Sequence, residues 1–539
     1  MRILYKIANK LFRIVKKILK LLTSRMVIIG VALLLEFCWL AGIVMQLNEK
    51  SVYINYAVTI LSLIAVLSII NNPKMNPGYK LMWAVCILAL PVTGICLYGI
   101  LGHSSVARKF RTHYDTVLLS QGGVLGEEEE TRKKLEEENI LAAGQSSYLT
   151  NYAHYPVYEN TETEYYPLGD VWFEHFIEEL KKAEHYIFME YFIISEGYLW
   201  DTVLEILKEK AAAGVDVRLI YDDFGCVTTL PYQYYKSLQQ MGIKCAAFNQ
   251  FRPVLNVILN NRDHRKIAVI DGHTAFTGGI NLADEYINRK ERFGHWKDSG
   301  ICLHGEAVWS FTVMFLQMWS TITGMECNFE SYRPEIYHEE AFKKDGFVQP
   351  YGDSPLDGET VGEHVYLNII SQAKKYLYIF TPYLIPDNET LTALCMAAKR
   401  GVDVRIVTPG IPDKKIVYIL TQANYEILLE SGVQIYQYTP GFIHSKSFVC
   451  DDEVATVGTI NMDYRSMYLH FECGVWMYGS SAVAQVKEDA LITFEQCEQI
   501  NMDYCRKKKF CSPCTPRCAE VSGTAAVNGT DSIVLRSSA

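Results

Sequence analysis

The apolar positions of the chain form two kinds of pattern. Near the N-terminus, three long apolar stretches follow one another, Met26–Leu47, Val52–Ile70 and Leu81–Leu101. Each is about long enough to cross the hydrocarbon core of a bilayer as a helix. From about residue 161 onward, short apolar runs of strand type alternate with helical patterns, which is typical of α/β domains. The sequence therefore predicts N-terminal transmembrane helices followed by an α/β part.

Two of the apolar stretches carry irregular residues. The first contains Glu36, which requires a partner or a water-facing side. The third contains Pro91, Gly94 and Gly99, which favour a kinked or re-entrant segment. We therefore expect two to three helices within residues 26–103.

Charge is distributed unevenly around these stretches. Residues 1–25 carry lysines and arginines but no acid. At helical spacing most of the bases share one face, which predicts a basic amphipathic helix on an anionic membrane surface; a solvated face of an ordinary helix is the alternative. The bases favour a cytoplasmic N-terminus, and Arg108, Lys109 and Arg111 favour the same side after the third stretch. Both ends can lie on the cytoplasmic side only if one of the three stretches does not cross the membrane. We therefore expect the catalytic part to face the cytoplasm.

One motif occurs twice in the α/β part, with every gap identical. It reads H-x-K-x4-D-x6-G-[GT]-x-N. The first copy contains His264, Lys266, Asp271, Gly278, Gly279 and Asn281, and the second contains His444, Lys446, Asp451, Gly458, Thr459 and Asn461. Two copies with a matching downstream segment make chance a poor explanation. Two unrelated strands that end in surface basic residues are the less favoured interpretation.

The motif residues suit chemistry on a phosphate. An imidazole can attack phosphorus while a second imidazole protonates the leaving alkoxide. Lys266 and Lys446, with the Asn281 and Asn461 amides, can neutralise and orient non-bridging oxygens. We take the His, Lys and Asp residues of both copies as the candidate catalytic set. Within it, Asp271 and Asp451 follow strands at turns, where an aspartate often caps backbone amides, so we expect them to be structural.

The repeat extends beyond the motif. Gly214–Ile220 matches Gly401–Val407, and Tyr186–Ile193 matches Tyr378–Ile385. Each half alternates strands and helices, which predicts a largely parallel sheet. Packed face to face, two such halves bring both histidines into one site. Downstream, Asp298 and Glu472 occupy equivalent positions in the two halves.

These motifs resemble those of the phospholipase D superfamily. The surrounding segments are similar to bacterial cardiolipin synthases from the membrane region to about residue 500, notably Arg262–Gly272, Phe276–Ile287, Phe293–Asp298 and Asn461–Ser466. The resemblance implies two duplicated phospholipase D-type α/β domains that share one active site. It also implies that Asp298 and Glu472 hold the imidazoles at Nδ1, with two exposed acids at strand starts as the alternative. It names His264 as the nucleophile and His444 as the acid/base.

The resemblance also implies a function. Phosphatidyl transfer between two phosphatidylglycerols through a phosphohistidine would give cardiolipin and glycerol. Membrane lipid would be the partner, with no nucleic acid, and the location would be the bacterial cell membrane, as a multi-pass protein. No cofactor and no metal are expected, because lysines supply the positive charge that a metal would supply.

Other functions stay open on the residues alone. Water or another alcohol as acceptor would make the chain a phospholipase D or a different phosphatidyltransferase. A degenerate, non-catalytic membrane scaffold is disfavoured by the intact His and Lys pairs. A nuclease is disfavoured by the net charge of −10, which suits polyanion binding poorly.

These patterns divide the chain into six parts. We expect a basic segment (1–25), a transmembrane region (26–103), a linker (104–160), a first domain (161–330), a second domain (331–500) and a Cys-rich, disordered tail (501–539). Most of the fifteen cysteines are scattered singly in apolar surroundings, which indicates reduced thiols. In the tail, Cys505, Cys511, Cys514 and Cys518 lack a zinc-fold spacing, so disorder is favoured over a zinc site.

Overall fold

The computed structural model describes residues 25–44, 49–73, 75, 77–101, 105–120, 123–126, 129–250 and 261–511. The chain divides into two compact units, one of which contains residues 1–109 and the other most of the rest. Residues 1–24, which make up nearly all of the expected basic helix, lie outside the described residues, and so does the tail beyond Cys511.

Among its described residues, the first unit contains four apolar helices. These are α2 (Arg25–Val44), α3 (Glu49–Ile70), α4 (Pro77–Ala89) and α5 (Pro91–Leu101). Glu36 on α2 is buried, and its carboxylate accepts a hydrogen bond from the Thr93 backbone N–H of α5 at 2.7 Å. The partner that this intrahelical acid requires is therefore a backbone amide at the start of a neighbouring helix.

The third apolar stretch is not one helix. It breaks between α4 and α5 at Leu90, directly before Pro91, whose ring has no N–H to continue the helix. A Cβ on Gly94 would lie 2.6 Å from the Cys86 carbonyl oxygen, so a glycine lets α5 approach α4 closely. Within the part of the chain that the structure describes, no helix combines the length and the apolarity that crossing a membrane requires. The expected transmembrane helices are thus not supported.

The second unit contains two α/β halves. The strands of the first half are β1 (Thr161–Tyr166), β2 (Tyr186–Tyr191), β3 (Asp216–Asp222), β4 (Lys244–Phe248), β5 (Arg262–Asp263), β6 (Ile267–Ile270), β7 (Thr274–Gly278), β8 (His295–Lys297) and β9 (Gly300–Gly305). Its helices are α9 (Gly169–Lys182), α10 (Tyr198–Ala212), α11 (Tyr234–Gln240), η2 (Asp284–Ile287) and α12 (Val308–Thr323), and η3 (Phe329–Tyr332) and α13 (Pro334–Tyr337) lead out of it.

The second half repeats this plan. Its strands are β10 (Phe347–Asp353), β11 (Tyr376–Phe380), β12 (Asp403–Pro409), β13 (Gln434–Tyr438), β14 (Gly441–Ile443), β15 (Ser447–Cys450), β16 (Val454–Gly458), β17 (His470–Tyr478) and β18 (Cys497–Ile500). Its helices are α14 (Val361–Gln372), α15 (Asn388–Lys399), α16 (Lys415–Ala423), α17 (Tyr425–Glu430), α18 (Tyr464–Tyr468), α19 (Ser481–Glu495) and α20 (Met502–Cys511).

The two large sheets have the same strand order. The first runs β1-β9-β7-β6-β2-β3-β4, and the second runs β10-β17-β16-β15-β11-β12-β13 with β18 added at the edge. Only β2-β3-β4 and β11-β12-β13 pair in parallel; the remaining neighbours along both orders pair antiparallel. The expectation of a largely parallel sheet is wrong, because tight turns join β6 to β7 and β15 to β16, and a tight turn joins strands only antiparallel. The duplicated α/β fold is confirmed.

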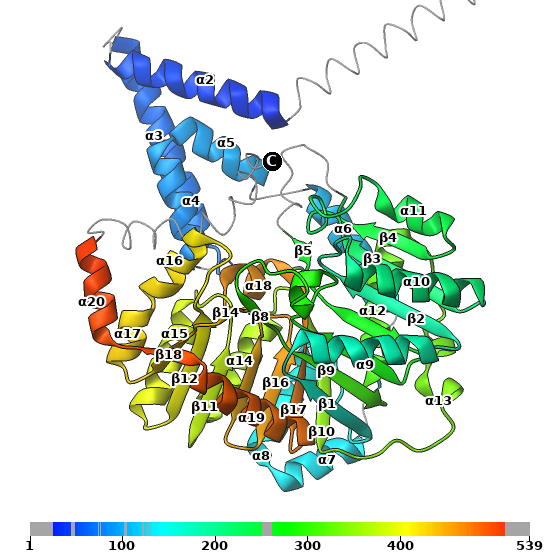
Figure 1. Cartoon of the computed structure of the whole chain (residues 1–539). Helices are drawn as coiled ribbons and strands as arrows, with labels where there is room; N and C mark the ends of the chain where they lie inside the picture. Colours follow the sequence, from blue (N-terminus) through cyan, green and yellow to red (C-terminus); the bar gives the residue numbers. More distant parts are fainter. Residues whose placement is uncertain are drawn as a thin grey trace, which may run out of the picture. The chain divides into compact units, whose positions relative to one another are not determined.

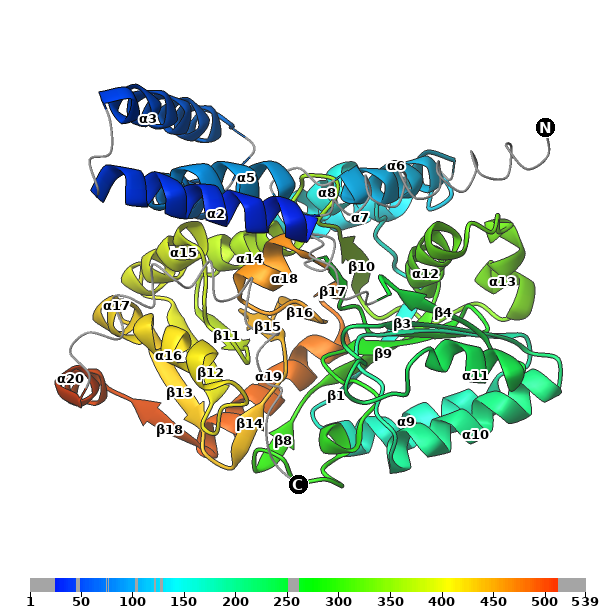
Figure 2. The same cartoon turned by 90° about the horizontal axis from the view of Figure 1, so that it is seen from above.

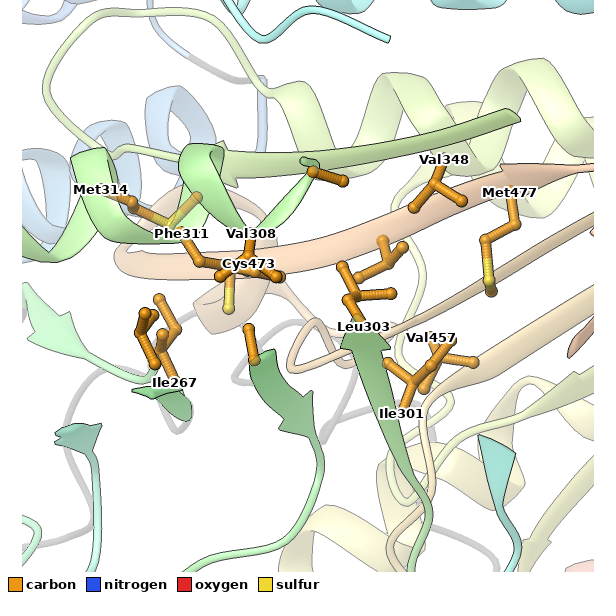
Figure 3. Packing of buried hydrophobic residues seen from close by; sticks show 14 of the residues in the cluster. Ile267, Ile301, Leu303, Val308, Phe311, Met314, Val348, Val457, Cys473 and Met477 are labelled. Atoms are coloured by element: carbon orange, nitrogen blue, oxygen red, sulfur yellow. The ribbon is translucent and has the colours of Figure 1, made fainter. Parts of the chain in front are cut away.

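Apolar side chains from both halves meet in one core. Ile267, Ile301 and Leu303 of the first half belong to the same buried cluster as Val457 and Met477 of the second (Figure 3). Helices α9 and α10 cover the outer face of the first sheet, and α14 and α15 cover that of the second (Figures 1 and 2). The two sheets therefore pack through their inner faces, as the internal repeat predicts.

Part of the segment expected to be a linker, α7 and α8, packs on the second half. Helix α6 spans Ser105–Ser120, α7 spans Glu129–Glu138 and α8 spans Ile140–Tyr152. Leu135 and Leu149 are fully buried in the core of the second half, and Gln349 donates to the Ser146 and Tyr155 carbonyl oxygens. At the other end, the expected tail begins with α20, where Tyr504 accepts a hydrogen bond from Gln422 at 2.8 Å. The described residues 129–152 and 502–511 therefore pack on the second half.

Candidate functional site

A short strand of each half delivers each motif histidine to the other half. Strand β5, just before His264, pairs in parallel with the start of β17, and β14, just before His444, pairs in parallel with β8. The His264 N–H then donates to the Phe471 carbonyl at 2.9 Å, and the His444 N–H donates to the Lys297 carbonyl at 2.7 Å. The backbone thus fixes both histidines at the boundary between the halves.

Each imidazole is held by a carboxylate from the opposite half. His264 Nδ1 lies 2.8 Å from Glu472 Oε2, and His444 Nδ1 lies 2.6 Å from Asp298 Oδ2. All four side chains are buried. A carboxylate on Nδ1 keeps the proton there and leaves the Nε2 lone pair free, which is the tautomer that a nucleophile or base requires. The sequence predicts the two carboxylates, and the structure adds that the pairs cross between the halves.

The motif position that differs between the copies, Gly279 and Thr459, contacts the carboxylate of Asp298 in the first copy and that of Glu472 in the second. Thr459 donates its hydroxyl to Glu472 at 2.5 Å. At the equivalent Gly279, a Cβ would lie 2.0 Å from Asp298 Oδ1, so only glycine leaves room for that carboxylate. The G-[GT] variation in the motif therefore reflects how each acid is packed.

The motif lysines lie beside the histidines and are buried. Lys266 Nζ donates to the His264 carbonyl at 2.7 Å. Lys446 Nζ donates to the His444 carbonyl and lies 2.9 Å from His444 Nδ1. Two buried ammonium groups next to two imidazoles make a site that favours an anion such as a phosphodiester.

Burial sets the protonation of these groups. It lowers the pKa of Lys266 to about 8 and that of Lys446 to about 7. Burial, with Lys446 second, lowers the pKa of His444 to about 4, and burial with Lys266 holds the pKa of His264 well below its ordinary value. Burial also raises the pKa of Glu472 well above its ordinary value. Both imidazoles are therefore neutral at physiological pH when the site holds no substrate, and a bound phosphate anion raises the pKa of each cation.

The motif asparagines differ in how far their amides are engaged. Asn281 accepts a hydrogen bond from the Ile193 N–H at 3.0 Å and donates to the Tyr286 hydroxyl at 2.7 Å. Asn461 Oδ1 is buried and has no hydrogen-bond partner among the described residues. The Asn461 side-chain oxygen can therefore accept a hydrogen bond from a ligand, whereas both ends of the Asn281 amide are engaged within its own half.

The motif aspartates cap turns, as their positions after strands predict. Asp271 accepts hydrogen bonds from the backbone N–H groups of Glu184, His185 and Tyr186 at 2.7–2.8 Å. Asp451 makes the equivalent three bonds to residues 374–376 at 2.6–2.8 Å. Both aspartates have positive φ, +48° and +56°, a region that Asp tolerates better than most residues. The two side chains join β6 to β2 and β15 to β11.

We expect Asp271→Ala to lower the free energy of unfolding by about 3 kcal/mol, because three backbone donors, one of them fully buried, lose their acceptor. Asp271→Asn should lose about half as much, since one amide oxygen can still accept and Asn tolerates positive φ. Denaturant unfolding followed by circular dichroism measures both. Equal stability of the alanine variant and the wild-type chain would contradict a capping role.

Two residues of the site have no counterpart in the motif. Tyr286, on η2, holds Asn281 and packs 5.5 Å from the His444 ring. His470 lies two residues before Glu472 on β17, and its ring is 5.4 Å from that of His264. Alternation along a strand puts His470 and Glu472 on one face, and this is the signal that could have identified His470.

Comparison with known proteins also finds one matching domain in each half of the chain. The family model described as "Cardiolipin synthase, PLD-like domain" matches residues 176–319 and 366–491, which lie one in each half. A second model, "Phospholipase_D-nuclease N-terminal", matches residues 60–103. A crystal structure of phosphatidylserine synthase from Haemophilus influenzae superimposes with a TM-score of 0.52 at 16% identity, covering 70% of this chain and 99% of that one. The structural likeness shows the fold.

Relatives match over most of the chain. An uncharacterized protein of Streptococcus mutans serotype c is 43% identical over 83% of this chain and 96% of its own length. A cardiolipin synthase of Alkalihalophilus pseudofirmus is 34% identical over 84% of this chain and 89% of its own length. Since this relative and the family model both span the two halves that build the site, the chain belongs to the PLD-like cardiolipin synthase family.

Proposed function

We propose that this chain is a cardiolipin synthase, a phosphatidyltransferase that joins two phosphatidylglycerols and releases glycerol. The observation that carries the proposal is the pair of crossed imidazole–carboxylate contacts, His264–Glu472 and His444–Asp298, held in one buried site between the halves. Two neutral imidazoles of fixed tautomer, with ammonium groups beside them, provide a nucleophile and an acid/base for a phosphodiester.

In the first step, His264 Nε2 attacks the phosphorus of phosphatidylglycerol, and the bond from phosphorus to the glycerol headgroup oxygen breaks. His444, protonated in the presence of the phosphate anion, gives its Nε2 proton to the leaving alkoxide. Glycerol departs, and the phosphatidyl group remains on His264. Glu472 stabilises the positive charge that the modified imidazole carries.

In the second step, the now neutral His444 takes a proton from a hydroxyl of a second phosphatidylglycerol. The oxygen attacks the phosphorus, the bond to His264 Nε2 breaks, and cardiolipin forms. Asp298 stabilises the imidazolium of His444 in both directions. We assign Lys266, Lys446 and the side-chain N–H groups of Asn461 to the charge on the non-bridging oxygens.

Because the first step uses protonated His444, whose pKa is about 4 in the substrate-free site, kcat/KM should fall with rising pH across the neutral range. We expect this fall to become steeper through about pH 7 to 8, because the pKa of Lys446 is about 7 and that of Lys266 about 8, and each loses its positive charge above its own pKa. Lys446→Arg should move the start of the steeper part up by about one pH unit, to the pKa of Lys266, because a guanidinium stays protonated. Initial rates on mixed micelles from pH 5 to 9 measure this. If Lys446→Arg left the high-pH part of the profile unchanged, the loss of rate could not be due to deprotonation of Lys446.

The apolar helices of the first unit supply a means of attachment to lipid. Phe37 on α2 and Tyr53 on α3 are 72% and 76% exposed, and Leu34 is 65% exposed. Exposed apolar side chains at this density mark a surface that contacts another apolar phase. We propose that α2–α5 hold the chain at the bacterial cell membrane. The twelve cysteines whose side chains the structure describes, from Cys38 to Cys505, are free, which favours a catalytic unit on the reducing, cytoplasmic side. Multi-pass crossing stays a prediction from the sequence.

Lipid analysis of a host that makes no cardiolipin of its own tests the proposal. The host would express the wild-type chain, His264→Ala, His444→Ala or the control His304→Ala, whose histidine lies outside the site. Cardiolipin should appear with the wild-type chain and the control and with neither site variant. Phosphatidic acid in its place would make water the acceptor, and a different phosphatidyl alcohol would name another acceptor. No change in lipids, with the chain present in membranes, would overturn the proposal.

A further inference from the structure

A third imidazole in the site has no role in the steps above. His470 is buried, with 8% of its surface exposed, and neither ring nitrogen makes a hydrogen bond within the described residues. Its Nδ1 lies 3.4 Å from Glu472 Oε1. Since His264 Nδ1 lies 2.8 Å from the other oxygen of Glu472, one carboxylate is flanked by two imidazoles. Buried histidine nitrogens without partners indicate a ligand that the described residues do not include.

The spacing of these three side chains suits a metal ion. His264, His470 and Glu472 each offer one ligand atom, and the three atoms lie within 4.8 Å of one another. In a tetrahedral zinc site with bonds of 2.0–2.1 Å, ligand atoms lie about 3.3 Å apart. The His470–Glu472 separation of 3.4 Å already has this value, and the His264–Glu472 contact has to open by about half an ångström. The two imidazole nitrogens lie within 4.8 Å of one another, so a rotation of the His470 ring has to bring them together by at most about 1.5 Å. Two histidines and one glutamate are a ligand set that zinc uses with one position left open.

We propose that His264, His470 and Glu472 form a binding site for a divalent transition-metal ion of the zinc class, and that occupancy inhibits the enzyme. Binding of the ion is independent of the function proposed above, whereas inhibition of phosphatidyl transfer rests on it.

Inhibition follows from the chemistry of the imidazole. In the active form, the His264 Nδ1–H donates to Glu472 and the lone pair on Nε2 faces phosphorus. A neutral imidazole has one N–H and one lone pair. When the ion binds Nδ1, the proton from Nδ1 moves to Nε2, and the lone pair that would attack phosphorus is lost. The ion also takes the Glu472 oxygens that would stabilise the phosphohistidine. No oxidant or further reactant is involved.

The surrounding charges decide which ions can bind. Lys266 and Lys446 repel a dication, and so do Arg262, Arg465 and Lys414 around His470. Asp298 and Asp463, both buried in the same site, oppose part of that repulsion. The site is therefore weaker than a purpose-built zinc site, and imidazole ligands favour Zn²⁺ or Co²⁺ over Mg²⁺ and Ca²⁺. Mg²⁺ and Ca²⁺ are accordingly expected to have no effect at concentrations at which Zn²⁺ inhibits.

The test measures Zn²⁺ binding to the full chain in detergent by competition with a chromogenic chelator, and the visible absorption of the Co²⁺ form. Three chains are compared: wild type, His470→Asn and the control His304→Asn. His304 lines a separate cleft of about 410 Å³ on the first half, which includes neither His264 nor His470. We expect one ion bound at this site per wild-type chain and per control, and affinity at least about 10-fold weaker for His470→Asn. His470→Gln serves if the asparagine variant does not fold.

The second measurement is the rate of cardiolipin formation, expressed for each chain as the ratio of the rates with and without Zn²⁺. The ratio corrects for any difference between the chains in their rates without the ion. Wild type and the control should be inhibited in the concentration range in which they bind the ion, and His470→Asn should resist. Equal affinity of wild type and His470→Asn would overturn the site. Binding that His470→Asn weakens, without inhibition of an active wild-type enzyme, would overturn the inhibitory role. Loss of cardiolipin formation in the metal-free wild-type chain would instead count against the proposed function.

Discussion

In the His264→Ala variant, formation of cardiolipin from phosphatidylglycerol is expected to fall by about 10⁴-fold or more, and in His444→Ala by a similar factor. The natural substrate cannot distinguish the two roles, because its glycerol alkoxide is a poor leaving group that requires both an attacking nitrogen and a proton donor. A phosphodiester with a p-nitrophenol leaving group separates them, since p-nitrophenolate departs without protonation.

With that substrate, His444→Ala should release one equivalent of p-nitrophenol per active site in a burst and then stop. Its His264 can still attack, and the covalent phosphoryl group remains because no base activates an acceptor. His264→Ala should give no burst. Rapid-mixing absorbance measures the burst, and mass spectrometry of the quenched chain locates the added mass on His264. The control His304→Ala should turn over as wild type does.

The opposite pattern, a burst in His264→Ala with the added mass on His444, would reverse the two roles. No burst in either variant, with wild-type turnover intact, would remove the phosphohistidine from the mechanism. Geometry does not rank the histidines, because their surroundings are nearly symmetric: each has a carboxylate on Nδ1, a lysine two residues later and a backbone bond to the opposite half.

Much of this site could be predicted from the sequence because the motif and its flanking segments occur twice in the chain. Equal spacing in the two motifs indicates one shared site, and aligning the segments after them places Asp298 opposite Glu472. The pairing of Arg262 with His470 and of Phe442 with Trp296 confirms that alignment. The sequence could not show which carboxylate holds which histidine, since either pairing is compatible with the same linear pattern. The exchange of β5 and β14 between the halves decides it.

The sequence match between the two halves misplaces strand β2 relative to β11 by two residues. The sequence match pairs Tyr186 with Tyr378, whereas the structure makes Tyr376 the equivalent: Tyr186 pairs with Asp216 and is capped by Asp271, and Tyr376 pairs with Asp403 and is capped by Asp451. A slip of two leaves every side chain on the same face of the strand. Hydrophobic alternation therefore could not reveal the error, and only the turn contacts do.

The apolar N-terminal region shows another limit of composition. Apolar stretches of sufficient length predict spans, but Pro91 divides the third stretch into α4 and α5, and the Glu36–Thr93 contact joins α2 to α5. Composition fixes how apolar a segment is, whereas breaks and contacts between helices decide how much continuous helix it forms. The same reasoning applies to α8, whose burial on the second half depends on partners such as Gln349 that are distant in sequence.

Replacing either carboxylate by its amide should be nearly as damaging as removing a histidine. We expect Glu472→Gln and Asp298→Asn to lower the rate on phosphatidylglycerol by about 10⁴-fold, the size of effect seen when a carboxylate that orients a catalytic histidine is made neutral. The amide no longer stabilises a positive imidazole, and it can favour the wrong tautomer. Asp452→Asn, which alters an exposed carboxylate paired with Lys487, is the matched control and should be active.

The p-nitrophenyl substrate then tests whether the pairs cross between the halves. Because Glu472 contacts Nδ1 of His264, Glu472→Gln should behave like His264→Ala and give a slow first step without a burst. Because Asp298 contacts Nδ1 of His444, Asp298→Asn should behave like His444→Ala, with a burst of p-nitrophenol after which turnover stops. If each carboxylate served the histidine of its own half, the two phenotypes would be exchanged. The crossed pattern also requires both halves for each step, so neither half expressed alone should show even a single turnover.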